Sequence, residues 1–410
     1  MTAVAEAPPA TTPRSRHFSR PLAFAAIAAI FLTFTSASAA PSPLYVVYQH
    51  LWNFSATTLT VVFAIYVVGL VGALLTLGAL SDHLGRRPVL AAAIALEVVS
   101  LILFLTAGDV GVLAAARFLQ GIATGAAMTT LGAALVDLNP PHAPGRAGLV
   151  NGIVPSAGLA LGALGAGALV QYAPAPTHFI WALLLGAMVI AGLVVLRIPE
   201  TSARRPGAAA SMTPKLGIPA RLRADVFALV PIIVASWAIG GLYLSLGPSV
   251  AAGVFGLGSH LIGGLVVTLL CGTGAVTSYF MRRLPTPRVL AIAASLLTLG
   301  AVVAVIGVEA DQVVVAAIGT VISGVGFGAS ALASFGTLAV LADPHERGKL
   351  LSVALVIAYI AFSVPAVIAG FAATSAGLQT TAVAYGVVVA VLGALALVAQ
   401  RLRTRRAVTA

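Results

Sequence analysis

The chain has 410 residues, of which 60% are hydrophobic and only 8% are charged, and its net charge is +11. This composition lies far outside the range of soluble globular proteins. The single cysteine, Cys271, excludes a disulfide framework, and the seven histidines show no metal-ligand spacing. We therefore expect an all-α membrane protein without a cofactor, a metal centre or catalytic residues.

Twelve apolar stretches are each long enough to cross a hydrocarbon core about 30 Å thick. Six of them cover 21–40, 57–81, 88–105, 112–137, 148–171 and 179–196. Six more cover 226–246, 261–280, 289–306, 313–341, 350–373 and 380–400. We expect twelve transmembrane helices in two six-helix bundles, at 21–198 and 226–400. A disordered N-terminal tail at 1–20, a central loop at 199–225 and a basic tail at 401–410 complete the chain.

The basic residues predict how the chain lies in the membrane. Every Lys and Arg except Arg117 falls in a tail or in a loop that follows an even-numbered helix. Lys and Arg in short loops are retained on the cytoplasmic side. The pattern predicts cytoplasmic N- and C-termini in a multi-pass protein of the cell inner membrane. It also accounts for the positive net charge, so no nucleic-acid partner is expected.

The two predicted halves resemble each other in sequence. The segment 121–126, GIATGA, recurs at 324–329 as GVGFGA, and the segment 141–146 recurs at 344–349, both with an offset of 203 residues. Two matches at one offset indicate a duplicated six-helix unit. Duplicated halves with a site at their interface are typical of secondary transporters.

The loop after the second helix contains an acid that needs a partner. Asp82 lies in the last helical turn, where the helix dipole favours cations such as Arg86 and Arg87. Arg86 is four residues away, and Asp137 at the end of the fourth helix can share it, so we expect these three side chains to form one cluster. Gly85 suits a left-handed helix end between them.

Arg117 and Glu97 are charged residues that lie well inside predicted spans. A charge at mid-bilayer costs about 2.5–3.5 kcal/mol on insertion scales, so such residues normally serve a cavity, an ion path or a substrate site. Their depths differ by roughly 6 Å, which an Arg side chain can span. One interpretation is a pair in a water-accessible cavity that couples protons to transport. In the other, Arg117 binds carbonyls of the first helix, and Glu97 faces headgroups or another subunit.

These patterns resemble the major facilitator superfamily. The loop Gly78-Ala-Leu-Ser-Asp82-His-Leu-Gly85-Arg86-Arg87 is similar to the family's signature after helix two, with His83 where a permanent cation is usual. The segment Arg117-Phe-Leu-Gln120-Gly121 is similar to the fourth-helix motif, whose Arg is associated with proton coupling. The glycines of helix five resemble the signature of the drug:proton antiporter branch, or simply allow close helix packing; they are Gly158, Gly162, Gly165 and Gly167.

The resemblance implies a conformational gate and a substrate cavity. The gate consists of Gly78, Asp82, Gly85, Arg86, Arg87 and Asp137, and Asp82 is expected to dock near the start of helix eleven, at 348–351. The cavity is expected from helices one, four, seven, ten and eleven, with a lining of Phe31, Phe34, Thr35, Gln120, Trp237, Tyr243, Ser330 and Tyr359. Aromatic and hydroxyl groups without carboxylates favour an uncharged or weakly anionic amphipathic solute.

The sequence leaves two functions open and disfavours a third. The first is export of a small drug-like or metabolic solute by proton antiport with alternating access, through Arg117 and Glu97, by a monomer in the lipid bilayer. The second is a proton symporter or facilitator for nutrient uptake on the same fold. The third, a membrane receptor or structural protein without transport, does not account for the gate-like charges or for Arg117.

Overall fold

The computed structural model describes residues 17–214, 216–343 and 346–409, and these residues form helices without strands. Within this part of the chain, eleven helical spans are long and apolar enough to cross a membrane, and Phe179–Val195 is a shorter apolar helix. Together they overlap all twelve predicted stretches, so the all-α membrane fold is confirmed. Most of the predicted N-terminal tail lies outside the described residues.

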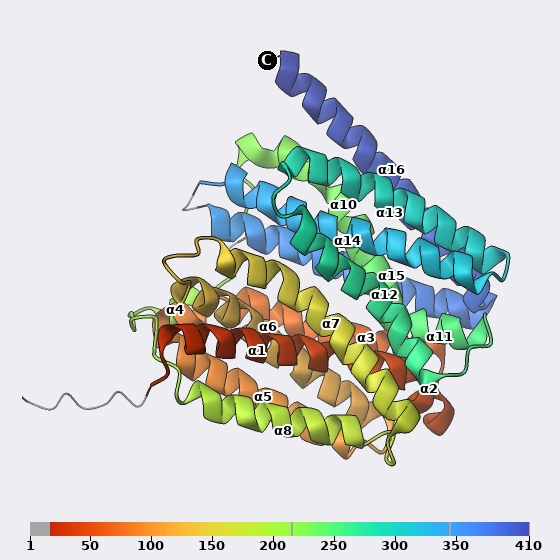
Figure 1. Cartoon of the computed structure of the whole chain (residues 1–410), viewed down its shortest axis with the longest axis horizontal. Coiled ribbons are helices and arrows are strands. Elements are labelled where there is room, and N and C mark those ends of the chain that lie inside the picture. The colour runs from red at the N-terminus through yellow and green to blue at the C-terminus, as the bar shows by residue number, and fades with distance from the viewer. Residues whose placement is uncertain (1–16, 215, 344–345, 410) are drawn as a thin grey trace, which may run out of the picture.

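The elements follow the chain in order (Figure 1). The first half contains α1 (Arg20–Ala39), α2 (Pro41–Trp52), α3 (Ala56–Leu77), α4 (Leu80–Leu84), α5 (Arg86–Leu105), α6 (Val110–Asp137), α7 (Arg146–Tyr172) and α8 (Phe179–Val195). The connector contains α9 (Ala208–Ser211) and the 3-10 turn η1 (Ala220–Leu222). The second half contains α10 (Arg223–Ser245), α11 (Gly247–Gly253), α12 (His260–Met281), α13 (Thr286–Glu309), α14 (Val313–Leu341), α15 (Arg347–Ala376) and α16 (Leu378–Thr409).

Helical structure continues past two of the predicted stretches. The helix α1 ends at Ala39, next to the predicted end at residue 40, but α2 follows it directly, so the apolar helical span runs from Arg20 to Trp52. Pro41 takes the first position of α2, where a missing N–H costs nothing. At the other end of the chain, α16 continues through Thr409, where we expected a separate tail from residue 401.

The duplicated segments have equivalent places in the two halves. Gly121 brings α6 against α3, and a Cβ there would lie 2.1 Å from the carbonyl oxygen of Tyr66. Gly328, in the matching segment, brings α14 against α12, and its Cβ would lie 2.1 Å from the carbonyl oxygen of Gly274. Each repeat thus packs the fourth helix of its half on the second. Residues 344–345 of the other repeated segment lie outside the described residues.

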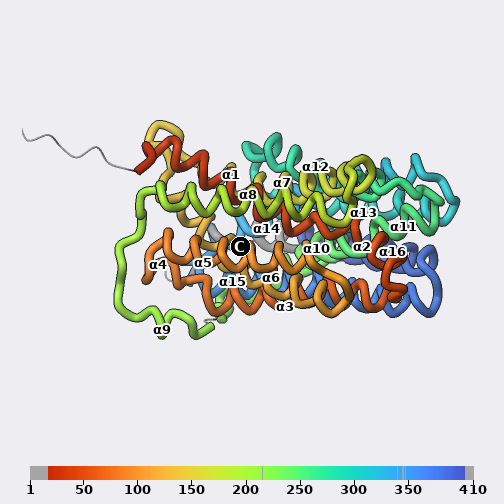
Figure 2. The backbone as a smooth tube through the Cα atoms, turned by 90° about the horizontal axis from the view of Figure 1, so that it is seen from below, coloured from red at the N-terminus to blue at the C-terminus, as the bar shows by residue number. Residues whose placement is uncertain are grey.

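The two ends of the bundle differ in charge. One end, called the basic end below, carries Arg20, Arg86, Arg146, Arg223 and Arg282 at helix termini. The opposite end carries acids such as Asp109 and Glu309, and its loops contain no Lys or Arg in the described chain. The connector that bears α9 extends from the basic end, next to α4 (Figure 2).

The two halves are joined towards the opposite end. Among the described residues, their hydrogen bonds lie between mid-helix and that end. They include Ser42 Oγ to Leu244 O at 2.7 Å, Thr57 Oγ1 with Thr374 Oγ1 at 3.0 Å, His260 N to Gln171 Oε1 at 3.0 Å and Thr268 Oγ1 to Ala160 O at 3.0 Å. The nearest such contact to the basic end joins Tyr359 OH to Met128 Sδ at 3.8 Å. The molecule is therefore closed at the opposite end.

Candidate functional site

The start of α6 fixes the position of Arg117. Asp109 caps this helix, because its Oδ1 accepts hydrogen bonds from the N–H groups of Gly111 at 2.7 Å and Val112 at 2.9 Å. Arg117 then lies about two turns inside the helix, and Gln120 follows on the same face because residues three apart are neighbours on a helix. Both side chains point towards α1 and α5, whose backbone and Glu97 they contact.

Gln120 connects the two buried charges. Arg117 donates from Nη1 to Gln120 Oε1 at 2.5 Å and to the carbonyl oxygen of Ser38 at 3.2 Å. The amide nitrogen of Gln120 donates to Glu97 Oε1 at 3.2 Å and to the carbonyl oxygen of Ala37 at 3.1 Å. Among the described residues, no ion pair joins Arg117 to Glu97 directly. The predicted pair therefore exists only through Gln120. The alternative interpretation holds for Arg117, which binds a carbonyl of the first helix, but not for Glu97, which is buried and faces neither headgroups nor another subunit.

The charged cluster is sealed from solvent in this conformation. Arg117 is 1% exposed, and Glu97 and Gln120 are 0% exposed. Tyr66 covers the guanidinium, whose Cζ lies 4.1 Å from the centre of its ring. The expected water-lined position of Arg117 is therefore wrong for this state. The reason is its depth: the cluster lies behind the closed opposite end, only about two helical turns from it.

Two polar atoms of the cluster have no hydrogen-bond partner among the described residues. They are Glu97 Oε2 and Arg117 Nε. An unsatisfied buried group costs about 1–3 kcal/mol, and more when it is charged. In this arrangement the cluster therefore lowers the stability of the fold.

A second cluster lies at the basic end and has the predicted composition. Arg86 contacts Asp82 through Nη1 and Oδ1 at 2.5 Å, and it contacts Asp137 through Nε and Oδ2 at 3.1 Å. Thr201 adds a hydrogen bond to the same oxygen of Asp137 at 2.9 Å. Arg87 lies apart from this cluster, because its Nη2 donates to the carbonyl oxygen of Leu196 at 2.7 Å. Arg87 thus fixes the end of α8, and Arg86 alone links the two acids.

Glu200 completes this cluster and was missed in the sequence. Its carboxylate accepts hydrogen bonds from the backbone N–H groups of Arg86 at 2.8 Å and Arg87 at 3.1 Å, so it caps the start of α5. Gly85 has φ +100°, and a Cβ there would lie 2.7 Å from Glu200 Oε2. Gly85 is therefore required both by its backbone angle and by the carboxylate beside it. The one sign of this role in the sequence is that Glu200 is an acid placed directly after the sixth apolar stretch.

A cavity of about 660 Å³ lies at the basic end between the two halves. Gly78, Asp82 and His83 line one side, and Gly348, Lys349 and Ser352 at the start of α15 line the other. Tyr359 lines it as well. Among the described residues, no hydrogen bond or ion pair joins Asp82 to α15, so the expected docking is not formed here. The molecule is open at the basic end while the opposite end is closed.

The predicted fifth helix is α7, and three of its four motif glycines lie where another helix approaches closely. A Cβ on Gly158 or Gly162 would lie 1.8 or 2.0 Å from an oxygen atom of α1, and one on Gly167 would lie 2.6 Å from the carbonyl oxygen of His260 in the other half. Gly165 faces open space. Close helix packing therefore explains the presence of glycine at three of these four positions.

Most residues predicted to line a substrate cavity lie elsewhere. Phe31, Phe34, Thr35, Gln120 and Ser330 are buried between helices and line none of the cavities described here, because helix packing fills the space around them. Trp237 packs edge-on against Tyr359, with 4.8 Å between ring centres. Tyr359 lines the basic-end cavity, and Tyr243 lines a separate apolar cavity inside the second half.

The second half has its own charge cluster in a different place. The loop 282–288 lacks the acid and glycine of the first-half signature. Instead, Arg221 of η1 in the connector forms ion pairs with Asp343 and Glu346, on either side of the α14–α15 turn. The cation of this cluster therefore comes from the connector and not from the loop 282–288.

Comparisons with known proteins agree with this architecture. The family model described as Major Facilitator Superfamily matches residues 22–366. The structure of a bacterial homologue of the human lysosomal transporter Spinster, in an inward-facing and unoccupied conformation, is similar with a TM-score of 0.71 at 12% identity, covering 95% of this chain and 98% of that one. The structure of the human organic anion transporter MFSD10 is similar with a TM-score of 0.65 at 18% identity, covering 94% of this chain and 100% of that one. The structure of the nucleoside transporter NupG is similar with a TM-score of 0.69 at 12% identity, covering 93% of this chain and 100% of that one. The chain therefore belongs to the Major Facilitator Superfamily and is a membrane transporter, not an enzyme.

Proposed function

We propose that this transporter is a monomeric proton antiporter that exports a small uncharged or weakly anionic amphipathic solute by alternating access. The observation that carries the proposal is the sealed cluster of Arg117, Gln120 and Glu97. A carboxyl group that can gain and lose a proton, beside a fixed cation, links protonation to the electrostatics of the site.

The burial of this cluster fits one state of an alternating-access cycle. The cluster lies behind the contacts that close the opposite end, such as Ser42 with Leu244 and Thr57 with Thr374. When these contacts open, water reaches Glu97, and the carboxyl exchanges its proton with that compartment. When they close, the cluster is sealed again, and the basic end is open to the solute. Antiport also requires that the Glu97 proton leave towards the basic end before the solute is carried to the opposite end, and we propose that the cluster opens to that side for this release.

We further propose that the basic end faces the cytoplasm and that the protein lies in the cell inner membrane. The arginines at helix termini are all at one end of the bundle in the described chain, as the positive-inside rule requires of a cytoplasmic side. The cavity of about 660 Å³ at that end then opens to the cytoplasm. An exporter needs this opening to load its solute.

Transport by purified protein in proteoliposomes tests the coupling and its direction. The probes are a panel of radiolabelled uncharged and weakly anionic amphipathic compounds. For an antiporter, a compound accumulates in the vesicles when the lumen is more acidic than the medium. Accumulation with an acidic medium would instead indicate symport, and equal rates with and without a gradient would indicate facilitated diffusion. Either result would reject the antiport proposal.

Asp82→Asn is expected to increase the population open at the basic end about twofold to fivefold. In the proposed gate, the start of α15 crosses the cavity and places its positive dipole end against the Asp82 carboxylate. This interaction stabilises the state closed at the basic end by about 0.3–1 kcal/mol, and the Asn substitution removes it. Spin labels on cysteines at Leu84 and Val340, which are 42% and 84% exposed in the two halves, report the width of that end. Asp311→Asn, an exposed acid at the opposite end, is the control. An unchanged distance distribution in Asp82→Asn would remove the gating role.

A further inference from the structure

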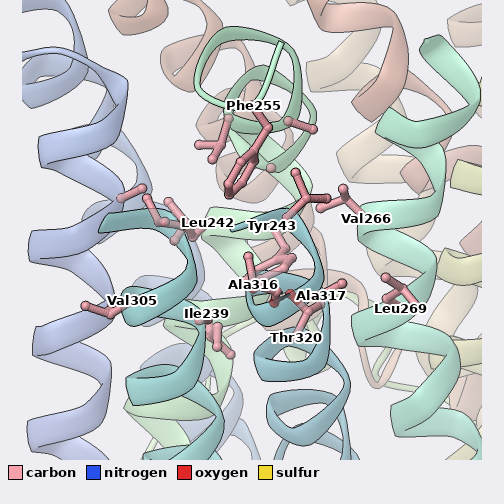
Figure 3. Close-up of a pocket in the computed structure, with 18 of the residues that line it drawn as sticks. Ile239, Leu242, Tyr243, Phe255, Val266, Leu269, Val305, Ala316, Ala317 and Thr320 are labelled. Atoms are coloured by element: carbon pink, nitrogen blue, oxygen red, sulfur yellow. Dashed lines mark hydrogen bonds between the residues drawn. The ribbon is translucent and has the colours of Figure 1, made fainter. Parts of the chain in front are cut away.

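A cavity of about 340 Å³ lies entirely within the second half (Figure 3). Its walls come from α10, α11, α12, α13, α14 and α16, so no residue of the first half lines it. The basic-end cavity, by contrast, lies between the halves. This second cavity is therefore separate from the path that alternating access opens and closes.

The cavity runs inwards from the opposite end of the bundle. Val308 at the end of α13 and Val313 at the start of α14 lie near its outer end, and Thr320 lies seven residues further along α14. Seven helical residues correspond to a depth of roughly 10 Å. Phe255, in the segment between α11 and α12, points into the cavity over Tyr243 (Figure 3). The space is thus about two helical turns deep, and an aromatic ring lies at its outer end.

Three side chains of the cavity wall carry hydroxyl groups, and they are Tyr243, Thr320 and Tyr385. Tyr243 and Thr320 contact each other at the inner end. Thr320 donates from Oγ1 to the carbonyl oxygen of Ala316 at 2.9 Å, and its oxygen lies 2.7 Å from Tyr243 OH. Because the hydrogen of Thr320 is committed to Ala316, Tyr243 is the donor in the contact between the two hydroxyls. Tyr385 donates to the carbonyl oxygen of Ala238 at 2.8 Å, which directs its hydroxyl to the backbone. The Tyr243 oxygen therefore retains lone pairs and has no hydrogen left to donate.

These groups determine what kind of molecule fits. No Asp, Glu, Lys, Arg or His lines the cavity, and an unpaired charge is too costly to bury among apolar walls. A ligand with one hydrogen-bond donor at its inner end satisfies the Tyr243 oxygen, and an apolar body fills the rest. The volume lies within the usual range of small-molecule sites, about 300–1,000 Å³.

We propose that this cavity is a binding site for a small neutral amphiphile with a terminal hydroxyl, such as an alkylphenol or an alkyl alcohol. The ligand enters from the opposite end past Phe255 and donates its hydroxyl hydrogen to Tyr243. Its apolar body contacts side chains such as Leu242, Val266 and Val305. The site does not depend on the transport cycle proposed above, because its walls belong to one half.

Equilibrium binding of radiolabelled 4-pentylphenol to the full-length protein in nanodiscs tests the proposal. Two matched probes differ at the terminal group alone. 4-Pentylanisole has no donor and should bind about threefold to tenfold more weakly, as the loss of one hydrogen bond requires. 4-Pentylbenzoate carries a charge and should not bind. Equal binding of the phenol and the anisole would overturn the proposed role of Tyr243.

Three variants place the binding in this cavity. Ala317→Phe fills the space and should abolish phenol binding. Tyr243→Phe removes the acceptor, so it should weaken the phenol to the level of the anisole and leave the anisole unchanged. Tyr385→Phe makes the same chemical change in the same wall, at a hydroxyl directed to the backbone, and should preserve the difference between the probes. Undiminished binding in Ala317→Phe, or a retained phenol preference in Tyr243→Phe, would overturn the site.

The ligand can come from solution or from the bilayer, because both contain hydroxyl-bearing amphiphiles. Nanodiscs with and without 1-decanol, a single-chain alcohol that partitions into the bilayer, separate the two sources. Displacement of 4-pentylphenol by 1-decanol assigns the site to a membrane alcohol, and retention of 4-pentylphenol assigns it to a soluble amphiphile. Both results depend on the phenol preference, so they support the site only if that preference is observed.

Discussion

Glu97→Gln is expected to reduce gradient-driven accumulation of solute at least tenfold while solute exchange across the membrane continues. The substituted amide has nearly the shape of the carboxyl. It keeps an oxygen that can accept the hydrogen bond from Gln120, which is 3.2 Å long in the unsubstituted protein. It cannot gain or lose a proton. Coupling to protons should therefore be lost without loss of the fold or of the transport path.

The structure explains why this position should be sensitive. Glu97 is completely buried, and its second oxygen has no partner among the described residues. The nearby cation reaches it only through Gln120. A proton on the carboxyl therefore changes the charge balance of a sealed network that contacts the α1 backbone at Ala37 and Ser38. These contacts join α6 to the helix whose continuation, α2, closes the opposite end.

Accumulation and exchange are measured separately in the same proteoliposomes. An imposed pH gradient drives accumulation, and counterflow of labelled solute against unlabelled solute measures exchange. Glu309→Gln is the matched control, because Glu309 is an exposed acid at the opposite end and should retain both activities. Full gradient-driven accumulation in Glu97→Gln would show that the proton is carried elsewhere. Loss of both activities together would show that Glu97 serves structure.

The positions of the helices along the chain could be predicted from the sequence because hydropathy marks each membrane span and the basic residues mark its orientation. All twelve apolar stretches became helices, since a membrane span must satisfy its own backbone hydrogen bonds. The cluster of Asp82, Arg86 and Asp137 was predictable for a similar reason. Residues four apart on a helix are neighbours, and an acid at a helix C-terminus needs a cation. Neither inference requires the rotation of one helix against another.

The buried network was harder to predict because it depends on that rotation. Gln120 was placed in the substrate cavity, although it lies between Arg117 and Glu97. Its position follows from how α6 faces α5 and α1, which the sequence of α6 alone does not determine. Glu200 was missed because its presence after α8 does not identify its partners, which are the backbone N–H groups of Arg86 and Arg87 and not side chains.

The cavity residues were misplaced for a related reason. Phe31 and Phe34 on α1 carry large side chains, but which face of a uniformly apolar helix meets water has no periodic signal. All faces of α1 are similarly apolar, so the sequence does not show which one lines a cavity. The prediction therefore took the aromatic and hydroxyl residues of the helices that line the cavity in the resembling family. Of the predicted lining, only Tyr359 of α15 and Tyr243 of α10 line cavities among the described residues.

Gly162→Ala is expected to destabilise the folded protein by about 1–3 kcal/mol, or more if the helices cannot separate. The added Cβ would lie 2.0 Å from the carbonyl oxygen of Ser36 and 2.6 Å from its Cα. These are backbone atoms of α1, so no side chain can rotate away, and α7 must move. Gly165→Ala is the matched control three residues along the same helix. Its Cβ meets nothing within 4 Å, so it should be neutral or should stabilise the helix by about 0.5–1 kcal/mol.

Thermal unfolding of the two variants in detergent, followed by circular dichroism, gives the comparison. Opposite shifts in the melting temperature would show that the helix-five glycines matter where α7 meets α1, and that their spacing alone does not predict antiport. Equal melting temperatures would show that the close approach of these helices is absent from the protein in solution. If Gly165→Ala instead lost transport while Gly162→Ala kept it, the motif would act in the transport cycle and the packing interpretation would fail.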